Sequence, residues 1–252
     1  PGWLILAAAC SSVAVLPQMA FANDTLRYHV ISGADDAEEG DDGAGVIDLA
    51  SSDLEITYDH AEPERAQLVG VRFQGVDIPK GMPILGAYIQ FTTDEDDKNR
   101  NTFDVQVYGE AADSAAPFSE TLNDISSRER TENSVQWAGI PDWTVEHEAG
   151  PNQQTPDLTA VVQEIVNREG WQSGNAMAFV IEGMGTRTAE SYEGSISEAD
   201  VVDLAPELVL TVPSRDVYRV SASDDDAEEG DDGPGMVAGR PEQATAAVAQ
   251  AK

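Results

Sequence analysis

The sequence contains very little cysteine and histidine. Its 252 residues include one cysteine, Cys10, and three histidines, His29, His60 and His147. A disulfide-rich scaffold is therefore excluded. A zinc site built from cysteine and histidine is not expected either, because the histidines are scattered along the chain.

Basic residues are also scarce. Lysine and arginine together number 14 against 47 aspartate and glutamate residues, and the formal net charge is −33. Such a chain cannot present the basic face that nucleic-acid binding requires, and an anionic membrane surface would repel it. Disorder is not expected, because 41% of the residues are hydrophobic and alternating apolar runs recur. The sequence predicts an acidic globular protein whose partners are cations or neutral molecules, with no nucleic acid and no insertion into a membrane.

One long run without charged residues lies near the start of the chain. Residues 3–22 are apolar or small and end in Ala-Phe-Ala, a pattern typical of a signal-peptidase site. A membrane anchor is disfavoured because the run is short and a Pro-Gln pair interrupts it. We therefore expect residues 1–22 to be a signal peptide that lacks its first residues, and the protein to be secreted. Its cleavage would remove Cys10, so that rigidity must come from a large core, from bound metal ions or from assembly.

Apolar residues alternate with a period of two over much of the chain, as they do in strands with one buried face. One segment has helical periodicity instead, with Thr155 as a candidate N-cap, Pro156 in the first turn and Gly170 at the end. One helix among many strands predicts an all-β fold, an antiparallel, jelly-roll-like β-sandwich with one short helix. The strands are expected at residues 28–31, 54–58, 69–73, 85–91, 103–108, 135–137, 176–181 and 208–212.

A nine-residue acidic segment occurs twice, at residues 35–43 and 225–233, with the identical sequence DDAEEGDDG. Calcium takes six to eight oxygen ligands, and crowded carboxylates repel one another unless a cation lies between them. We therefore expect each copy to form a loop that binds Ca2+, the alternative being a solvated acidic loop. Magnesium fits less well because it prefers to keep its waters, and the spacing is not that of an EF-hand. The candidate ligands are Asp35, Asp36, Glu38, Glu39, Asp41 and Asp42 in the first copy, and Asp225, Asp226, Glu228, Glu229, Asp231 and Asp232 in the second.

Several short motifs follow one another between residues 28 and 212. They are the acidic motif at 35–39, SSDLE at 51–55, VRF at 71–73, AYIQF at 87–91, TPDL at 155–158, AESY at 189–192 and APEL at 205–208. In these motifs the chain resembles a β-sandwich repeat module of large secreted proteins of marine bacteria, of the DNRLRE-type or carbohydrate-binding-like kind. The resemblance implies a non-catalytic, extracellular, calcium-stabilised domain. It also implies that Asp53, Glu55, Asp94, Glu95 and Glu190 are oxygen ligands or loop anchors.

The second acidic copy is followed by an Ala- and Gln-rich tail in place of a second module. We therefore expect one domain over residues 23–213, and a duplicated first strand and acidic loop with a tail over residues 214–252. The duplication matches Tyr28 with Tyr218 and Val30 with Val220. If the second copy pairs with a neighbouring subunit by β-strand addition, the contact builds a head-to-tail fibre. The alternatives are that it folds back on its own domain or is the remnant of a lost repeat.

No catalytic constellation is recognised in the sequence. Glu146-His147-Glu148 lacks the second histidine of a zinc-protease helix, and no triad motif accompanies Ser191. Trp137, Trp143 and Trp171 fit a protein core better than a sugar-binding platform. The sequence thus predicts a non-enzymatic, extracellular, calcium-binding structural protein that assembles as a homopolymer. The alternatives are a carbohydrate-binding or adhesive module, with polysaccharide as its partner, and a secreted hydrolase.

Overall fold

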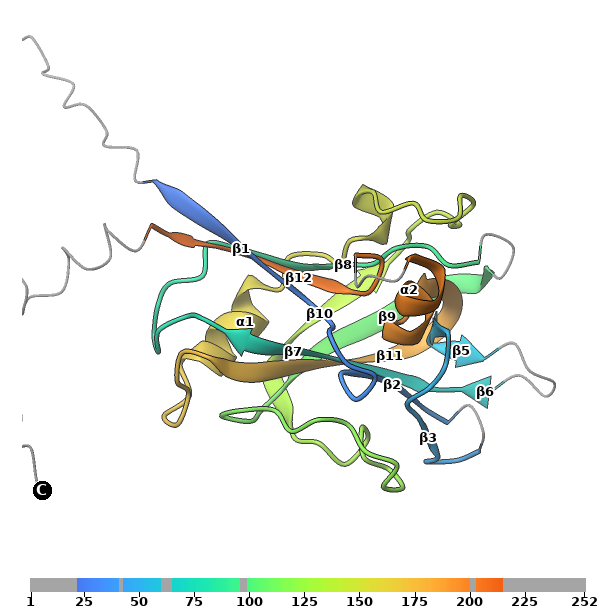
Figure 1. Cartoon of the computed structure of the whole chain (residues 1–252), viewed down its shortest axis with the longest axis horizontal. Helices are drawn as coiled ribbons and strands as arrows, with labels where there is room; N and C mark the ends of the chain where they lie inside the picture. The colour runs from blue at the N-terminus through green and yellow to red at the C-terminus, as the bar shows by residue number, and fades with distance from the viewer. Residues whose placement is uncertain (1–21, 41–42, 60–64, 96–98, 200–202, 215–252) are drawn as a thin grey trace, which may run out of the picture.

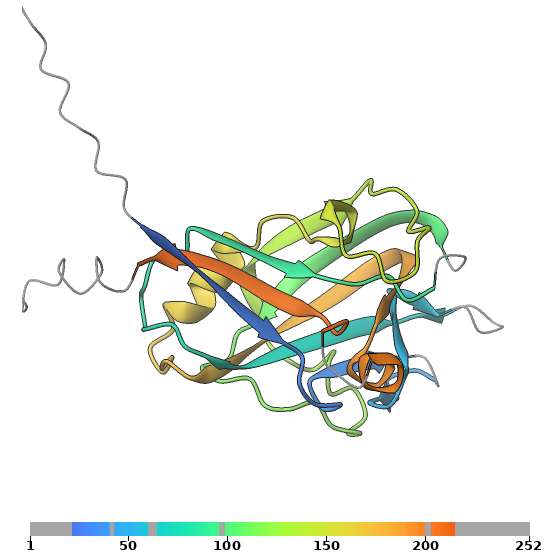
Figure 2. The ribbon, with the colours of Figure 1, turned by 45° about the horizontal axis from the view of Figure 1, so that its top comes forward.

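The computed structural model describes residues 22–40, 43–59, 65–95, 99–199 and 203–214. In these ranges antiparallel strands form a seven-stranded sheet, a three-stranded sheet and a small two-stranded sheet (Figures 1 and 2). The predicted all-β sandwich with a short helix is confirmed. The expected signal peptide and the second acidic copy lie outside the described residues.

The larger sheet carries the longest strands. Its order is β10 (Arg130–Ala138), β9 (Arg100–Glu110), β11 (Asn175–Glu190), β7 (Leu68–Val76), β2 (Asp36–Glu39) and β3 (Ile47–Asp48), while β4 (Asp53–Ile56) pairs with the last residues of β11. The smaller sheet has the order β1 (Asn23–His29), β12 (Glu207–Pro213) and β8 (Gly86–Gln90), and β5 (Tyr58–Asp59) pairs with β6 (Arg65–Ala66). The helical elements are the 3-10 turn η1 (Pro151–Gln153), α1 (Thr159–Val166) and α2 (Tyr192–Ala199).

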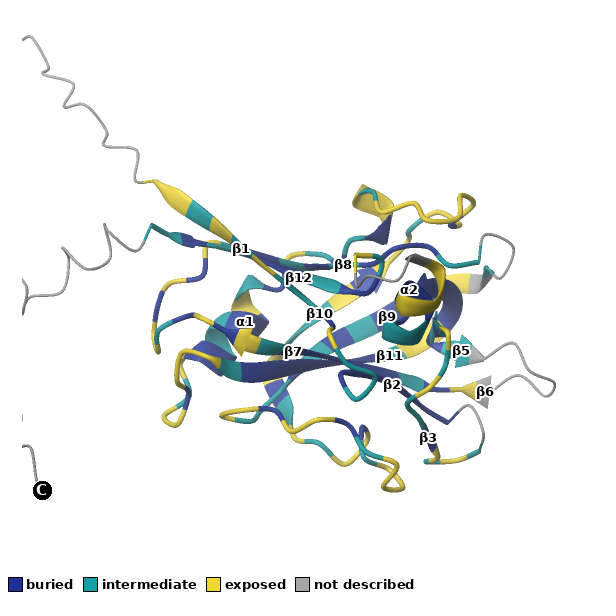
Figure 3. Cartoon of the chain, in the orientation of Figure 1, coloured by how far each residue is buried: buried dark blue, intermediate teal, exposed yellow. Residues whose placement is uncertain are grey.

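The main core lies between the two larger sheets, where β7 and β11 are buried over most of their length (Figure 3). Alternate residues point into it, as the period-two pattern predicts. Phe73 of β7 and Phe179 of β11 meet edge to face, with ring centroids 6.0 Å apart. Each side chain of this size contributes roughly 1.5–3 kcal/mol through burial. Because each predicted strand segment overlaps an observed strand, the alternation located this core correctly.

Three of the four tryptophans of the chain belong to the core. Trp137, Trp143 and Trp171 are each 1% exposed, and Trp137 lies between Phe91 and Phe103 at centroid distances of 5.8 and 5.1 Å. The interpretation of these residues as core is confirmed, and no sugar-stacking platform is formed by them.

The helical content differs from the prediction in two ways. Helix α1 begins at Thr159, later than expected, because Thr155 is bound to β8: its N–H donates to Ile89 O and its Oγ1 accepts from Ile89 N, both at 3.0 Å. Helix α2 is not predicted at all, since its sequence YEGSISEA offers little apolar periodicity. Neither helix among the described residues is long and apolar enough to cross a membrane.

Candidate metal centre

Acidic side chains from several separate segments meet at the end of β11. Two groups of ligand-type side chains occur there, and within each group the ligand atoms lie within 4.8 Å of one another. One group is entirely carboxylate, and the other contains an imidazole. The first is Asp53, Asp94 and Glu95, and the second is His147, Glu190 and Glu198.

Sheet pairing brings two of these acids face to face. Asp53, the first residue of β4, is the register partner of Glu190, the last residue of β11. Like charges directly opposite one another in an antiparallel pair are destabilising. The pair therefore requires protonation, water or a cation between the carboxylates.

The segment after β8 supplies the next acids. Glu190 N–H donates to Thr92 O at 2.9 Å, and Asp94 N–H donates to Thr188 O at 3.0 Å. Because of these two bonds, residues 92–94 lie alongside the end of β11. The backbone alone therefore places Asp94 next to Glu190.

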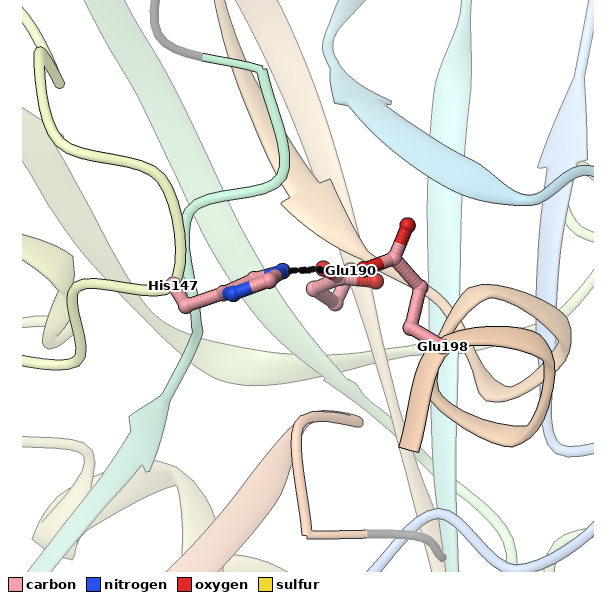
Figure 4. Close-up of side chains that lie close together, drawn as sticks. All are labelled: His147, Glu190 and Glu198. Carbon is pink, nitrogen blue, oxygen red and sulfur yellow. Dashed lines mark hydrogen bonds and ion pairs between the residues drawn. The ribbon is translucent and has the colours of Figure 1, made fainter. Parts of the chain in front are cut away.

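His147 lies in the segment between β10 and η1, beside the residues that follow β8. Its N–H donates to Thr93 O at 2.8 Å, and Thr93 N–H donates to Glu148 O at 2.9 Å. The backbone of His147 has φ 60, a left-handed conformation that costs a non-glycine residue roughly 1–2 kcal/mol. The imidazole Nε2 lies 3.2 Å from Glu190 Oε1 and 3.1 Å from Glu198 Oε2 (Figure 4).

Glu190 is the most unusual member of the cluster. Its side chain is 0% exposed, and neither of its carboxylate oxygens accepts a hydrogen bond from the described residues. Burial, and then the carboxylates of Asp94 and Glu198, raise the pKa of Glu190 to about 8. Burial, and then the carboxylates of Asp53 and Glu95, raise the pKa of Asp94 to about 7. Without a cation, the cluster therefore holds protons that ordinary carboxyl groups lose at much lower pH.

The chemistry of this donor set is that of a cation site. Several carboxylates converge on a small volume, and the buried one accepts no hydrogen bond from the described residues and has only the His147 imidazole as an ion-pair neighbour. Hard divalent cations take oxygen ligands of this kind, whereas imidazole nitrogen is a ligand for borderline transition metals. The arrangement is thus suited to divalent cations, and its two groups differ in the class of metal that they favour.

The first acidic copy has a different structure from the expected loop. Residues Asp36–Glu39 form strand β2, so the prediction of a loop is wrong for them. A high density of charge ordinarily indicates exposure, but the four acids of residues 35–39 are at most 3% exposed.

Protein groups, not solvent, surround these four carboxylates. Asp35 forms a buried ion pair with Arg72. The other three accept hydrogen bonds of 2.7 Å from main-chain amides, Asp36 from Tyr192, Glu38 from Glu55 and Glu39 from Ser126. The first copy thus acts within the fold as a strand whose acids are matched by specific donors.

The remaining predicted ligands fall into two sets. Asp41 and Asp42, and the whole second set from Asp225 to Asp232, lie outside the described residues. Of the five residues implied by the family resemblance, Asp53, Asp94, Glu95 and Glu190 belong to the two groups, and Glu55 belongs to neither.

Sequence reasoning missed His147 and Glu198. The tripeptide containing His147 lacks a protease motif, and Glu198 lies on helix α2, which the sequence does not predict. No local signal connects residues so far apart in the chain, because only the fold brings them together.

The chain matches no known family model, and a search of curated proteins finds no match. The fold and the candidate site place the chain among antiparallel β-sandwich proteins, with a carboxylate-rich candidate metal centre. The resemblance to the secreted bacterial module stays a prediction.

Proposed function

We propose that this chain is a non-enzymatic, calcium-binding structural module of an extracellular protein. The ion is held by Asp53, Asp94, Glu95 and Glu190 at the end of β11. The observation that carries the proposal is the buried carboxylate of Glu190, which accepts no hydrogen bond from the described residues and faces Asp53 across the sheet.

The dimensions of the cluster support calcium. Oxygen ligands bound to Ca2+ at about 2.3–2.6 Å lie at most roughly 5 Å apart. The carboxylate oxygens of Asp53, Asp94 and Glu95 lie within 4.8 Å of one another. A calcium ion there neutralises the mutual repulsion of these acids. It also ties β4, the segment after β8 and the end of β11 to one another.

Thermal unfolding of the full chain with calcium or with a chelator tests the proposal. Saturation at 100 times the Kd stabilises a protein by about 2.7 kcal/mol, which for this size raises Tm by roughly 5–10 °C. Asp53→Asn and Glu190→Gln should abolish this rise. Glu120→Gln, a change of an exposed acid outside the cluster, is the matched control. An unchanged Tm after chelation would disprove the calcium proposal.

We further propose that the chain assembles head to tail through residues 225–233. Its support is their identity with residues 35–43, whose first four acids each have a matching donor in the fold. The residues that correspond to Tyr218 and Val220 in the first copy also form hydrogen bonds. Tyr28 Oη accepts one from Asp77 N, and Val30 N donates one to Pro206 O. In a second copy of the chain these partners are bound to that copy's own residues 28–39, so the duplicated segment uses them only where it replaces those residues.

Light scattering and electron microscopy of the full chain in millimolar calcium test the assembly. We expect polymers that disappear when residues 217–252 are deleted. Deletion of residues 236–252 alone is the matched control, because it keeps the duplicated acidic segment. Monomers in all three samples would contradict head-to-tail assembly and would leave the calcium proposal standing.

No observation among the described residues favours the carbohydrate-binding alternative, since the three tryptophans lie in the core. The secreted-hydrolase alternative likewise stays a prediction from the sequence.

A further inference from the structure

We propose a second metal site beside the calcium site, in which His147, Glu190 and Glu198 bind a borderline divalent cation of the zinc class. The inference goes beyond the proposed function. It shares Glu190 with the calcium site but depends on a nitrogen ligand that calcium does not need.

The distances between the donor atoms favour a small ion. His147 Nε2 is 3.1 Å from Glu198 Oε2 and 3.2 Å from Glu190 Oε1. Ligands bound at about 2.0–2.2 Å in tetrahedral or octahedral geometry lie roughly 2.8–3.6 Å apart. The two distances from the imidazole therefore already have the spacing of ligands around such an ion, all three ligand atoms lie within 4.8 Å of one another, and the side chains point toward one another (Figure 4).

The second observation is the state of Glu190. A carboxylate that is 0% exposed and accepts no hydrogen bond from the described residues is stabilised by a positive charge placed beside it. A cation bound between Glu190 Oε1 and His147 Nε2 supplies that charge.

The two outer ligands leave the site open. The side chains of His147 and Glu198 are 42% and 45% exposed, whereas Glu190 forms the buried floor. An ion can therefore enter from solvent, and water can complete its coordination. Zinc sites with three protein ligands commonly have this arrangement.

The nitrogen atom decides the class of metal. Calcium and magnesium prefer oxygen ligands, whereas imidazole is a ligand for Zn2+ and its neighbours in the first transition row. The group of Asp53, Asp94 and Glu95 contains oxygen only, so the two halves of the cluster select different ions.

Calorimetric titration of the full chain with Zn2+, in saturating calcium, tests the inference. We expect one Zn2+ per chain. His147→Gln should weaken binding at least about tenfold, because loss of a residue that only orients a metal ligand already costs about that much. His29→Gln is the matched control, because His29 lies on β1 and its Nδ1 is 3.4 Å from Ala205 O. Zinc binding that is the same in both variants would overturn the proposal.

Cobalt gives a readout that a purely structural histidine would not change. Co2+ bound through His147 should show visible ligand-field absorption, and His147→Gln should lose it while circular dichroism shows a folded protein. If neither Zn2+ nor Co2+ binds the folded chain, His147 acts only as an ion-pair partner and the inference is wrong.

The two metal proposals fail separately. Asp53→Asn should remove the calcium-dependent rise in Tm and keep zinc binding, while His147→Gln should do the reverse. Glu190→Gln should impair both, because Glu190 belongs to the group of His147 and Glu198 and is the register partner of Asp53 in the other group.

Discussion

Asp36 shows how the fold uses single acidic residues. It is 2% exposed on β2, and its Oδ2 accepts a hydrogen bond from Tyr192 N at 2.7 Å. Burial, and then the nearby carboxylates of Glu193 and Asp35, raise the pKa of Asp36 to about 8. Between the ordinary pKa of 3.8 and this value, the folded chain binds a proton that the unfolded chain has lost. The free energy of unfolding therefore falls as pH rises through this interval.

Replacing Asp36 by Asn should remove this pH dependence. The amide keeps an oxygen for the Tyr192 N–H and carries no charge, so Asp36→Asn should match the natural chain at or below about pH 4, where the carboxyl group of Asp36 is protonated in the folded chain and largely protonated in the unfolded chain. By pH 8 it should be more stable by about 1–3 kcal/mol, the range for a buried polar group without full compensation. Urea unfolding between these pH values, with a chelator present, measures the difference. Asp104→Asn is the control, and parallel pH profiles of the natural chain and Asp36→Asn would contradict the prediction.

At the scale of elements, α2 links the metal centre to β4. Gly194 lies in its first half, and a Cβ there would be 2.1 Å from Ser52 O and 2.7 Å from Glu190 Oε2. Ser191 Oγ donates to Ser51 O at 2.7 Å and accepts from Gly194 N at 3.0 Å. The helix can approach the start of β4 this closely only because residue 194 has no side chain.

Gly194→Ala should therefore displace α2 from the sheet. Because the clash involves main-chain atoms, we expect a destabilisation of about 1–3 kcal/mol. Hydrogen exchange at the α2 amides should accelerate, and zinc affinity should fall as Glu198 moves. Ser197→Ala, a change at an exposed position on the same helix, should have neither effect. Unchanged exchange rates in Gly194→Ala would show that the helix accommodates the methyl group.

Some elements of the fold can be predicted from the sequence, and others cannot. Alternation located β7, β9 and β12, because burial of one face leaves a period of two in the sequence. The acids of residues 35–39 do not follow that rule, because they are buried beside groups that lie far away in the sequence: Arg72, the partner of Asp35, follows 37 residues later. The metal centre combines residues from β4, β11, α2 and two loops. The acidic run at residues 94–97 and the resemblance suggested some of its carboxylates, and nothing in the sequence indicated the position of His147.

At the scale of the whole molecule, the net charge of −33 has two components. Some acids are buried and matched, as Asp35 is by Arg72, or gathered at the metal centre. The other acids give the folded chain a self-repulsion that any salt screens, since the screening length falls to about 8 Å at physiological ionic strength. A general salt effect and a specific calcium effect on stability should therefore coexist, and they can be distinguished.

The distinction is best measured as Tm in KCl, in KCl with magnesium and in KCl with calcium. Raising KCl alone should raise Tm gradually, because screening weakens the repulsion among all exposed acids. At about 0.15 M KCl, millimolar calcium should raise Tm by several degrees beyond the same concentration of magnesium, which has equal charge but keeps its waters. Glu190→Gln should remove the difference between calcium and magnesium and keep the response to KCl, since it alters the site and leaves the exposed acids in place. Equal shifts with calcium and magnesium in the natural chain would mean that divalent cations act only by screening, and that the cluster at the end of β11 does not select calcium.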